Sequence, residues 1–202
     1  SDAGLKIAAH FYNHNMATHG GKLEAVMLSK ILDENQRKAI VWDVERGAPN
    51  QIMEQPWQSC SCIGGWHYTT SVYENNWYKS ASDVAKLLID IVSKNGNLLL
   101  SVPLRADGTF DEKEEKILNE FGEWMNINKE AIYSTRPWEV FGEGPIAEAD
   151  IKINAQGFNE GAYSKATAQE LRFTQTKKDL YATVLAWPEN GNVVIKSLAA
   201  DS

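Results

Sequence analysis

The feature that most constrains the fold is an amphipathic segment followed directly by a continuous apolar run. The segment's apolar residues repeat with the spacing of one helix face: Val84, Leu87, Leu88, Ile91 and Val92. Ser82 is predicted to cap this helix, and Asn95-Gly96 to end it. Residues 97–103, Asn-Leu-Leu-Leu-Ser-Val-Pro, then read as a parallel strand buried on both faces. The pair is typical of an α/β fold.

The same alternation of helices and strands extends in both directions. Residues 5–16 carry an apolar helical stripe that stops at Gly20-Gly21. Strands are predicted at residues 23–28 and 39–45, with a polar connector at 33–37, and a short strand is possible at 57–62. Asp111 and Glu114 form a capping-box-like pair ahead of another helix. An α/β barrel or a doubly wound sheet would fit this order.

From about residue 139 the pattern changes to short β segments at 171–174, 180–187 and 193–195. The turn at residues 188–191 is predicted to join the last two as a hairpin. Three or four parallel strands cannot close a barrel of eight. We therefore expect residues 1–138 to be the later part of a (β/α)8-like barrel and residues 139–202 the beginning of an all-β sandwich. The missing N-terminal half of the barrel would leave an edge strand exposed.

Composition excludes several classes of function. The 202 residues are 43% hydrophobic, enough for a real core, and carry a formal charge of −7 with dispersed Lys and Arg, which argues against a nucleic-acid surface. No stretch reaches the roughly 18 apolar residues of a membrane helix, and we expect any export signal to lie outside these residues. A neutral or weakly charged substrate fits better.

Metal binding is not expected. Cys60 and Cys62 are the only cysteines, too close in sequence for an unstrained mutual disulfide and too few for a zinc motif, so buried or spectator thiols are the preferred interpretation. His10 and His14 have helical i, i+4 spacing but lack a third ligand. Surface histidines are the preferred interpretation there.

Glu45 is the candidate catalytic residue. It closes the apolar run 39–45 and is followed by a long loop, residues 46–81, that is rich in ring-bearing side chains: Trp57, Trp66, His67, Tyr68, Trp77 and Tyr78. Sugar C–H patches lie against aromatic faces, and low local polarity raises a carboxyl pKa until the group can protonate a leaving oxygen. The pattern favours cleavage of glycosidic bonds.

Several motifs together resemble the α-L-fucosidases of glycoside hydrolase family 29. The resemblance covers about residues 5 to 196 and rests on these segments: Trp42-Asp43-Val44-Glu45-Arg46-Gly47, Pro56-Trp57-Gln58, Gly64-Gly65-Trp66-His67-Tyr68, residues 92–100, Gly122-Glu123-Trp124 and residues 130–133. Ser101-Val102-Pro103-Leu104 departs modestly from the Asn-Ile/Val-Gly-Pro of many members. The resemblance implies a barrel followed by a β-sandwich, and removal of terminal α-L-fucose with retention through a covalent intermediate. It also implies that no metal or cofactor is required.

The resemblance also implies roles for individual residues. Glu45 would be the acid/base, and the nucleophile, an Asp on an earlier strand, would precede residue 1. A rim carboxylate paired with Arg46 is the alternative for Glu45. Asp43, on the same strand face, is expected to tune Glu45 from outside the reaction centre rather than to act as nucleophile.

Four further residues are candidates for substrate binding. Trp66 matches the position that packs near the methyl group of fucose, a contact that would separate fucose from galactose. Trp57 would line the pocket or anchor the loop. His67 is either a ligand to the sugar or a hydrogen-bonded loop residue. Arg46 would steer Glu45 or bind a substrate hydroxyl.

Two other functions stay open. The chain would be a catalytically inactive remnant that binds fucosylated glycans, or a retaining glycosidase with a different sugar preference. By resemblance, the expected location is the periplasm, the cell exterior or a lysosome-like compartment.

Overall fold

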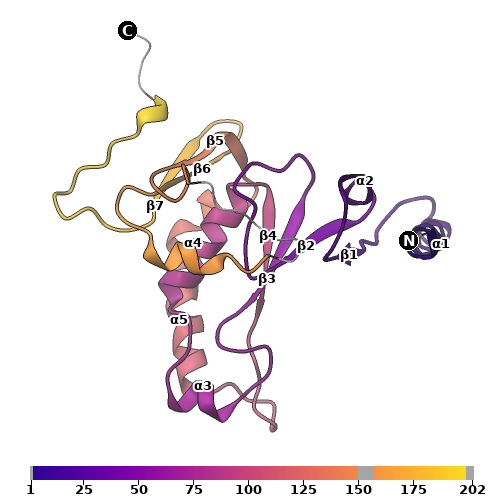
Figure 1. Cartoon of the computed structure of the whole chain (residues 1–202), viewed down its shortest axis with the longest axis horizontal. Coiled ribbons are helices and arrows are strands. Elements are labelled where there is room, and N and C mark those ends of the chain that lie inside the picture. Colours follow the sequence, from indigo (N-terminus) through magenta and orange to yellow (C-terminus); the bar gives the residue numbers. More distant parts are fainter. Residues whose placement is uncertain (1, 150–156, 199–202) are drawn as a thin grey trace.

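The computed structural model describes residues 2–149 and 157–198. Its centre is a parallel sheet in the order β1-β2-β3-β4, next to an antiparallel sheet in the order β5-β6-β7 (Figure 1). The parallel strands are β1 Leu28–Ser29, β2 Val41–Glu45, β3 Trp57–Cys62 and β4 Gly96–Ser101. The antiparallel strands are β5 Arg136–Glu143, β6 Leu171–Gln175 and β7 Leu180–Val184.

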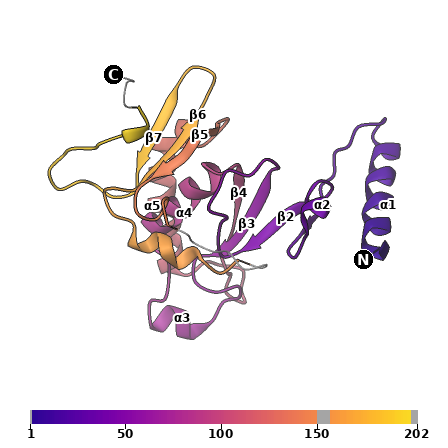
Figure 2. The ribbon, with the colours of Figure 1, turned by 45° about the horizontal axis from the view of Figure 1, so that its top comes forward.

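The helices differ in how closely they join the sheets. Helix α4 packs against β4 and α5, whereas α1 lies away from α4, α5 and the antiparallel sheet and bonds to the segment before β2 through Tyr12, whose hydroxyl donates to Ala39 O at 2.9 Å (Figures 1 and 2). The helices are α1 Asp2–Thr18, α2 Glu34–Arg37, α3 Thr70–Glu74, α4 Ala81–Val92 and α5 Glu112–Asn128. Short 3-10 helices are η1 Lys129–Ala131, η2 Glu160–Lys165 and η3 Lys196–Leu198. No helix among the described residues is long and apolar enough to cross a membrane.

The core lies between the parallel sheet and α4. Alternate residues of β2, Trp42 and Val44, point into it and pack with residues of β3 and α4: Trp57, Leu87 and Ile91. Because side chains alternate along a strand, Asp43 and Glu45 lie on the opposite face, which would be the interior of a closed barrel. Strand geometry thus separates the packing residues of β2 from its polar ones.

A buried ionic contact joins the antiparallel sheet to α4. Arg172 of β6 donates from Nε to Asp90 Oδ1 of α4 at 2.6 Å, and both side chains are fully buried. Asp90 Oδ2 also accepts from Lys94 Nζ at 2.8 Å. The antiparallel sheet is therefore connected to α4, which covers the parallel sheet, by buried polar groups.

Most predicted strands are confirmed, with shifted ends. Strands β2, β3 and β4 occupy the segments predicted at 39–45, 57–62 and 97–103, and β5 begins at Arg136. The strand predicted at 23–28 is wrong except at Leu28, because β1 pairs with β2 through two residues only. The connector at 33–37 contains a helical turn, since Asp33 and Gln36 form a capping box.

Two other local predictions are wrong. Helix α4 is capped by Ser80 rather than Ser82, because Asp83 stands three residues after Ser80 and completes a capping box. The hairpin predicted around residues 188–191 is also wrong, since residues 193–195 form no strand. The hairpin connects β6 to β7 instead, where Thr176 N donates to Asp179 O at 2.9 Å.

Candidate active site

Glu45 ends β2 and shares its interior face with Asp43. The side chains of Glu45 and Asp43 are 22% and 15% exposed, so both are sheltered but reachable by solvent. In the parallel register Asp43 pairs with Gln58 and Glu45 with Cys60 of β3. Gln58 Nε2 donates to Asp43 Oδ1 at 3.0 Å. The sheet thus holds two carboxylates at its carboxyl end, as the sequence predicted.

Lys30 joins these carboxylates and was not found from the sequence. Its Nζ lies 3.0 Å from Asp43 Oδ2 and 3.5 Å from Glu45 Oε2, and it donates to Cys60 Sγ at 2.9 Å. Burial lowers the pKa of Lys30, but the hydrogen bonds to Cys60 and Asp43 and the charge of Asp43 outweigh it and raise the pKa. Lys30 therefore stays charged at neutral pH. The one signal that could have identified Lys30 as part of the site is its position directly after β1, the strand that pairs with β2.

Trp66 and His67 lie in the loop that follows β3, at the same edge of the sheet as Glu45. Both are exposed, Trp66 by 40%. They line an open depression of about 400 Å³ with Tyr68 and three residues of the loop after β4: Pro103, Leu104 and Ala106. An exposed indole at this edge is available for stacking on a sugar.

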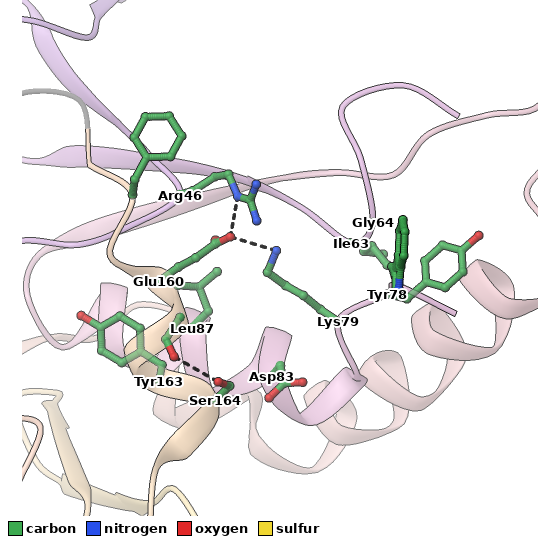
Figure 3. Close-up of a pocket in the computed structure, with 13 residues that line it drawn as sticks. Arg46, Ile63, Gly64, Tyr78, Lys79, Asp83, Leu87, Glu160, Tyr163 and Ser164 are labelled. Carbon is green, nitrogen blue, oxygen red and sulfur yellow. Dashed lines mark hydrogen bonds and ion pairs between the residues drawn. The ribbon is translucent and has the colours of Figure 1, made fainter. Parts of the chain in front are cut away.

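Arg46 forms an ion pair with Glu160. Its Nε donates to Glu160 Oε1 at 2.6 Å, and Lys79 Nζ lies 3.1 Å from the same oxygen (Figure 3). Burial of Glu160 would raise its pKa, but hydrogen bonds from Ser61 and Arg46 and the charge of Lys79 outweigh it and hold the pKa below its ordinary value. Arg46, Lys79 and Glu160 line a cavity of about 520 Å³ that Glu45 does not line. The alternative that Glu45 is a rim carboxylate paired with Arg46 is therefore wrong in its pairing, because the cation beside Glu45 is Lys30.

Trp57 lies in the core rather than in a pocket. It is 1% exposed, and its Nε1 donates to Lys94 O at 2.9 Å. Gly96 leaves room for the ring, since a Cβ at that position would lie 2.6 Å from two ring atoms of Trp57. The prediction that Trp57 lines the substrate pocket is therefore corrected, and its anchoring role is the one that its contacts support.

The residues considered for metal binding lie apart from Glu45 or are thiols beside it. His10 and His14 stack on exposed α1, with ring centroids 6.2 Å apart. Cys60 and Cys62 are free and buried, and burial raises the pKa of both thiols. Within residues 2–149 and 157–198, no three metal-ligating side chains of the His, Cys, Asp and Glu types gather into a possible site.

The arrangement around Glu45 is suited to acid–base chemistry. A carboxyl group stands at a strand end with a second carboxylate and a fixed ammonium beside it, and exposed aromatic side chains follow in the next loop. Such a group can give a proton to a leaving oxygen and take one from water.

Comparisons with solved structures identify the architecture. An alpha-L-fucosidase superposes with a TM-score of 0.67 at 21% identity, over 89% of this chain and 35% of that one. Alpha-L-fucosidase isoenzyme 1 from Paenibacillus thiaminolyticus gives a TM-score of 0.52 at 26% identity, over 74% and 30%. Fucosidases of this kind combine a TIM barrel with a β domain. The chain accordingly holds part of the barrel followed by part of the β domain.

Sequence comparisons agree with this assignment. Mouse tissue alpha-L-fucosidase is 27% identical over 151 residues, which are 74% of this chain, and the chain spans 28% of the mouse protein. An alpha-L-fucosidase of Dictyostelium discoideum is 34% identical over 93 residues, covering 46% of this chain and 20% of that protein. The family model described as Alpha-L-fucosidase matches residues 5–130, more than half of the chain. The chain therefore belongs to the alpha-L-fucosidase family.

Proposed function

We propose that this chain is part of a retaining exo-glycosidase that removes terminal α-L-fucose from glycans. The observation that carries the proposal is the position of Glu45: a carboxyl group at the carboxyl end of a parallel strand, on the interior face beside Asp43, in a chain of the alpha-L-fucosidase family. Active sites of barrel enzymes lie at that end of the strands.

The proposed reaction has two steps. In the first, a carboxylate nucleophile forms a bond to the anomeric carbon while Glu45 donates its proton to the departing glycosidic oxygen. In the second, Glu45, now a carboxylate, takes a proton from water as the water oxygen attacks the anomeric carbon. The nucleophile leaves, fucose is released and Glu45 is again protonated.

The nucleophile is proposed to come from polypeptide outside these 202 residues. The described sheet has four parallel strands, and the chain spans 28% of the mouse relative. The remaining strands of the barrel would have to supply the attacking Asp, with residues 1–138 as the later part of the barrel and 139–202 as the start of the β-sandwich. Asp43 is proposed to act on Glu45 through Lys30, which contacts both carboxylates.

Substrate recognition is proposed to use the loop after β3. The exposed indole of Trp66 would pack on the methyl group of fucose, and His67 beside it would bind a hydroxyl. A hydroxymethyl group in that apolar contact would be left without a hydrogen-bond partner, which disfavours galactose. Arg46 is proposed to support Glu45 through its bond to Glu160 rather than to bind sugar.

The proposed location is the cell exterior, the periplasm or a lysosome-like compartment. The relatives from human and orangutan are named plasma alpha-L-fucosidases. Fucosylated glycans are the substrates that the family name supports.

The acid role of Glu45 is tested by changing it to Gln in the enzyme completed by the rest of its barrel. Glu45→Gln should lower kcat/KM for alkyl fucosides by a factor of about 100 to 10,000, the usual worth of general acid catalysis, because their leaving oxygen needs a proton. Activated aryl fucosides, which scarcely need one, should lose far less. Glu74→Gln, an exposed residue of α3, is the control.

Three results would contradict parts of the proposal. Equal losses on both substrate types would remove the acid role from Glu45. Binding of fucose without turnover by the unmodified enzyme would instead favour an inactive glycan-binding remnant. Faster cleavage of another sugar in a panel of nitrophenyl glycosides would show a different specificity.

A further inference from the structure

Residues 157–165, which contain η2 and lead toward β6, cross the carboxyl end of β2 and contact residues 45–48. We call this segment the strap. Phe158 N donates to Glu45 O at 2.7 Å, and Glu160 N donates to Arg46 O at 3.0 Å. The side chain of Asn159 accepts from Ala48 N and donates to Ala48 O, both at 2.9 Å. With the bond from Arg46 Nε to Glu160 Oε1, five hydrogen bonds connect the strap to Glu45, Arg46 and Ala48.

Two glycines allow this close approach of backbone to backbone. Gly157 has a φ of +121°, and a Cβ there would collide with the carbonyl oxygen of Glu45. Gly47 faces the strap from the other side, where a Cβ would collide with Oδ1 of Asn159. Side chains at either position would push the strap away from β2.

The turn that follows Glu45 is strained, and the strap holds it. Arg46 has a φ of +49°, in the left-handed region that is unfavourable for a residue with a Cβ. Its backbone N donates to Cys60 O at 2.8 Å, and its carbonyl and guanidinium are both bound by Glu160. This turn sends the side chain of Arg46 to the cavity in Figure 3, whereas the carboxylate of Glu45 lies beside Lys30 and does not line that cavity.

Glu160 is itself held firmly. Ser61 Oγ donates to its Oε2 at 2.5 Å, and Lys79 Nζ lies 3.1 Å from Oε1. Its side chain is 10% exposed. The strap is therefore attached to β3 and to Lys79, two residues before α4, as well as to β2, so it has little freedom to shift relative to the sheet.

We propose that the strap is a positioning element for Glu45, with Asn159 and Glu160 as its positioning residues; this rests on the proposed acid role of Glu45. The strap fixes the carbonyl of Glu45 and the turn after it, which sets the direction of the carboxyl group. A displacement of about 1 Å can cost about 100-fold in rate when a proton must be delivered to one atom. Residues far along the sequence, next to the antiparallel sheet, would thus control proton delivery in the barrel.

The test compares strap variants of the complete enzyme on two substrates. Asn159→Ala removes both hydrogen bonds to Ala48 from a partly buried side chain. We expect kcat/KM to fall about tenfold or more for an alkyl fucoside and by less than about twofold for an activated aryl fucoside. Gly161→Ala lies in the same segment, where a Cβ would meet no atom within 4 Å, and should change neither value.

A second measurement follows the position directly. In the 202-residue chain, Asn159→Ala should speed amide hydrogen exchange at Ala48, whose N–H loses its acceptor, while Gly161→Ala leaves that rate unchanged. If Asn159→Ala does not fold, Glu160→Gln, which keeps the shape of the side chain, takes its place. The positioning role is then judged by the same comparison of the kcat/KM losses on the alkyl and aryl fucosides.

The outcomes separate this inference from the proposed function. Suppose that Glu45→Gln loses more activity on the alkyl fucoside than on the aryl fucoside. Equal losses on both substrates, or no loss, in Asn159→Ala (or in Glu160→Gln, if Asn159→Ala does not fold) would then overturn the positioning role. A Glu45→Gln enzyme that loses activity equally on both substrates would overturn the proposed function, and the positioning role with it.

Discussion

At the scale of single residues, alternation along β2 decides what each side chain can do. Trp42 and Val44 fill the core, and Asp43 and Glu45 share the open face with Lys30. Trp57 and Trp66 illustrate the same separation, since one indole is buried in the core and the other is exposed beyond the end of β3. Their variants should therefore affect different properties.

Trp57→Phe should reduce stability and leave sugar recognition intact. The change removes the hydrogen bond to Lys94 O and leaves a gap in the core, which together should lower the free energy of unfolding by about 2 kcal/mol. Trp66→Ala should change stability by less than about 0.5 kcal/mol but raise KM for fucosides. Urea denaturation and steady-state kinetics measure the two effects, and a KM effect from Trp57→Phe would contradict its assignment to the core.

Glu160→Gln should alter how stability depends on pH. Because the pKa of Glu160 is held below its ordinary value of 4.5, its contribution to stability is present above about pH 4.5 and is lost as pH falls through the lowered pKa. At pH 7 the variant should be less stable by about 2 kcal/mol, and the difference should shrink in acid. Thermal unfolding of both proteins between pH 7 and pH 3 measures this. If the stability difference between the unmodified chain and Glu160→Gln grew as the pH fell, the expected direction of the pH dependence would be wrong.

At the scale of elements, sequence patterns located strands and helices better than their connections. Strand β3 has the predicted bounds, because the residue types next to it in the sequence indicate where a strand begins and ends. The strand at 23–28 failed because strand formation needs a partner of matching length, which β1 finds for two residues only. The prediction of a hairpin around residues 188–191 was wrong for a similar reason, because turn residues do not reveal which strand is available for pairing.

The same distinction applies to the candidate site. Asp43, Glu45 and Trp66 could be proposed from the sequence because they lie in a strand or in the loop after one, within recognisable motifs. Lys30, Asn159 and Glu160 were missed because their contacts join segments that lie 13 to 114 residues apart. Only the folded chain brings these groups together.

The cap of α4 offers a test at this scale. Ser80 Oγ accepts from Asp83 N at 3.1 Å, whereas Ser82 lies exposed in the first turn. Ser80→Ala should lower the free energy of unfolding by about 1 kcal/mol, the usual value of an N-cap, and Ser82→Ala should change it by less than about 0.5 kcal/mol. Chemical denaturation of both variants gives the comparison. A larger loss of stability from Ser82→Ala than from Ser80→Ala would mean that Ser82 caps the helix, as the sequence predicted.

At the scale of the whole molecule, buried charges join the antiparallel sheet to the barrel part. Asp90 stands between Arg172 and Lys94, and these two cations hold the pKa of Asp90 low despite complete burial. Arg172 also contacts Glu170 Oε2 at 3.1 Å, so the buried group holds two positive and two negative side chains, and removing one of them leaves one buried charge unbalanced. The connection between the antiparallel sheet and α4 therefore depends on the group as a unit.

Asp90→Asn should destabilise the chain by about 3–5 kcal/mol, and Arg172→Met should have a comparable effect. The double variant should lose less than the sum, because neither charge is then left without the other. A double-mutant cycle from urea denaturation measures the coupling. Strict additivity would mean that the 2.6 Å contact does not contribute to stability as a pair.

The crossing of Gly157 over Glu45 has a consequence for biosynthesis. The ribosome makes Glu45 more than a hundred residues before it makes the segment that seats it. A nascent polypeptide can pair β2 with β3 early, yet the hydrogen bonds between the turn at Arg46 and residues 157–165 can form only after that segment has left the exit tunnel. The surroundings that the proposed acid role of Glu45 requires would then be completed long after Glu45 itself is made.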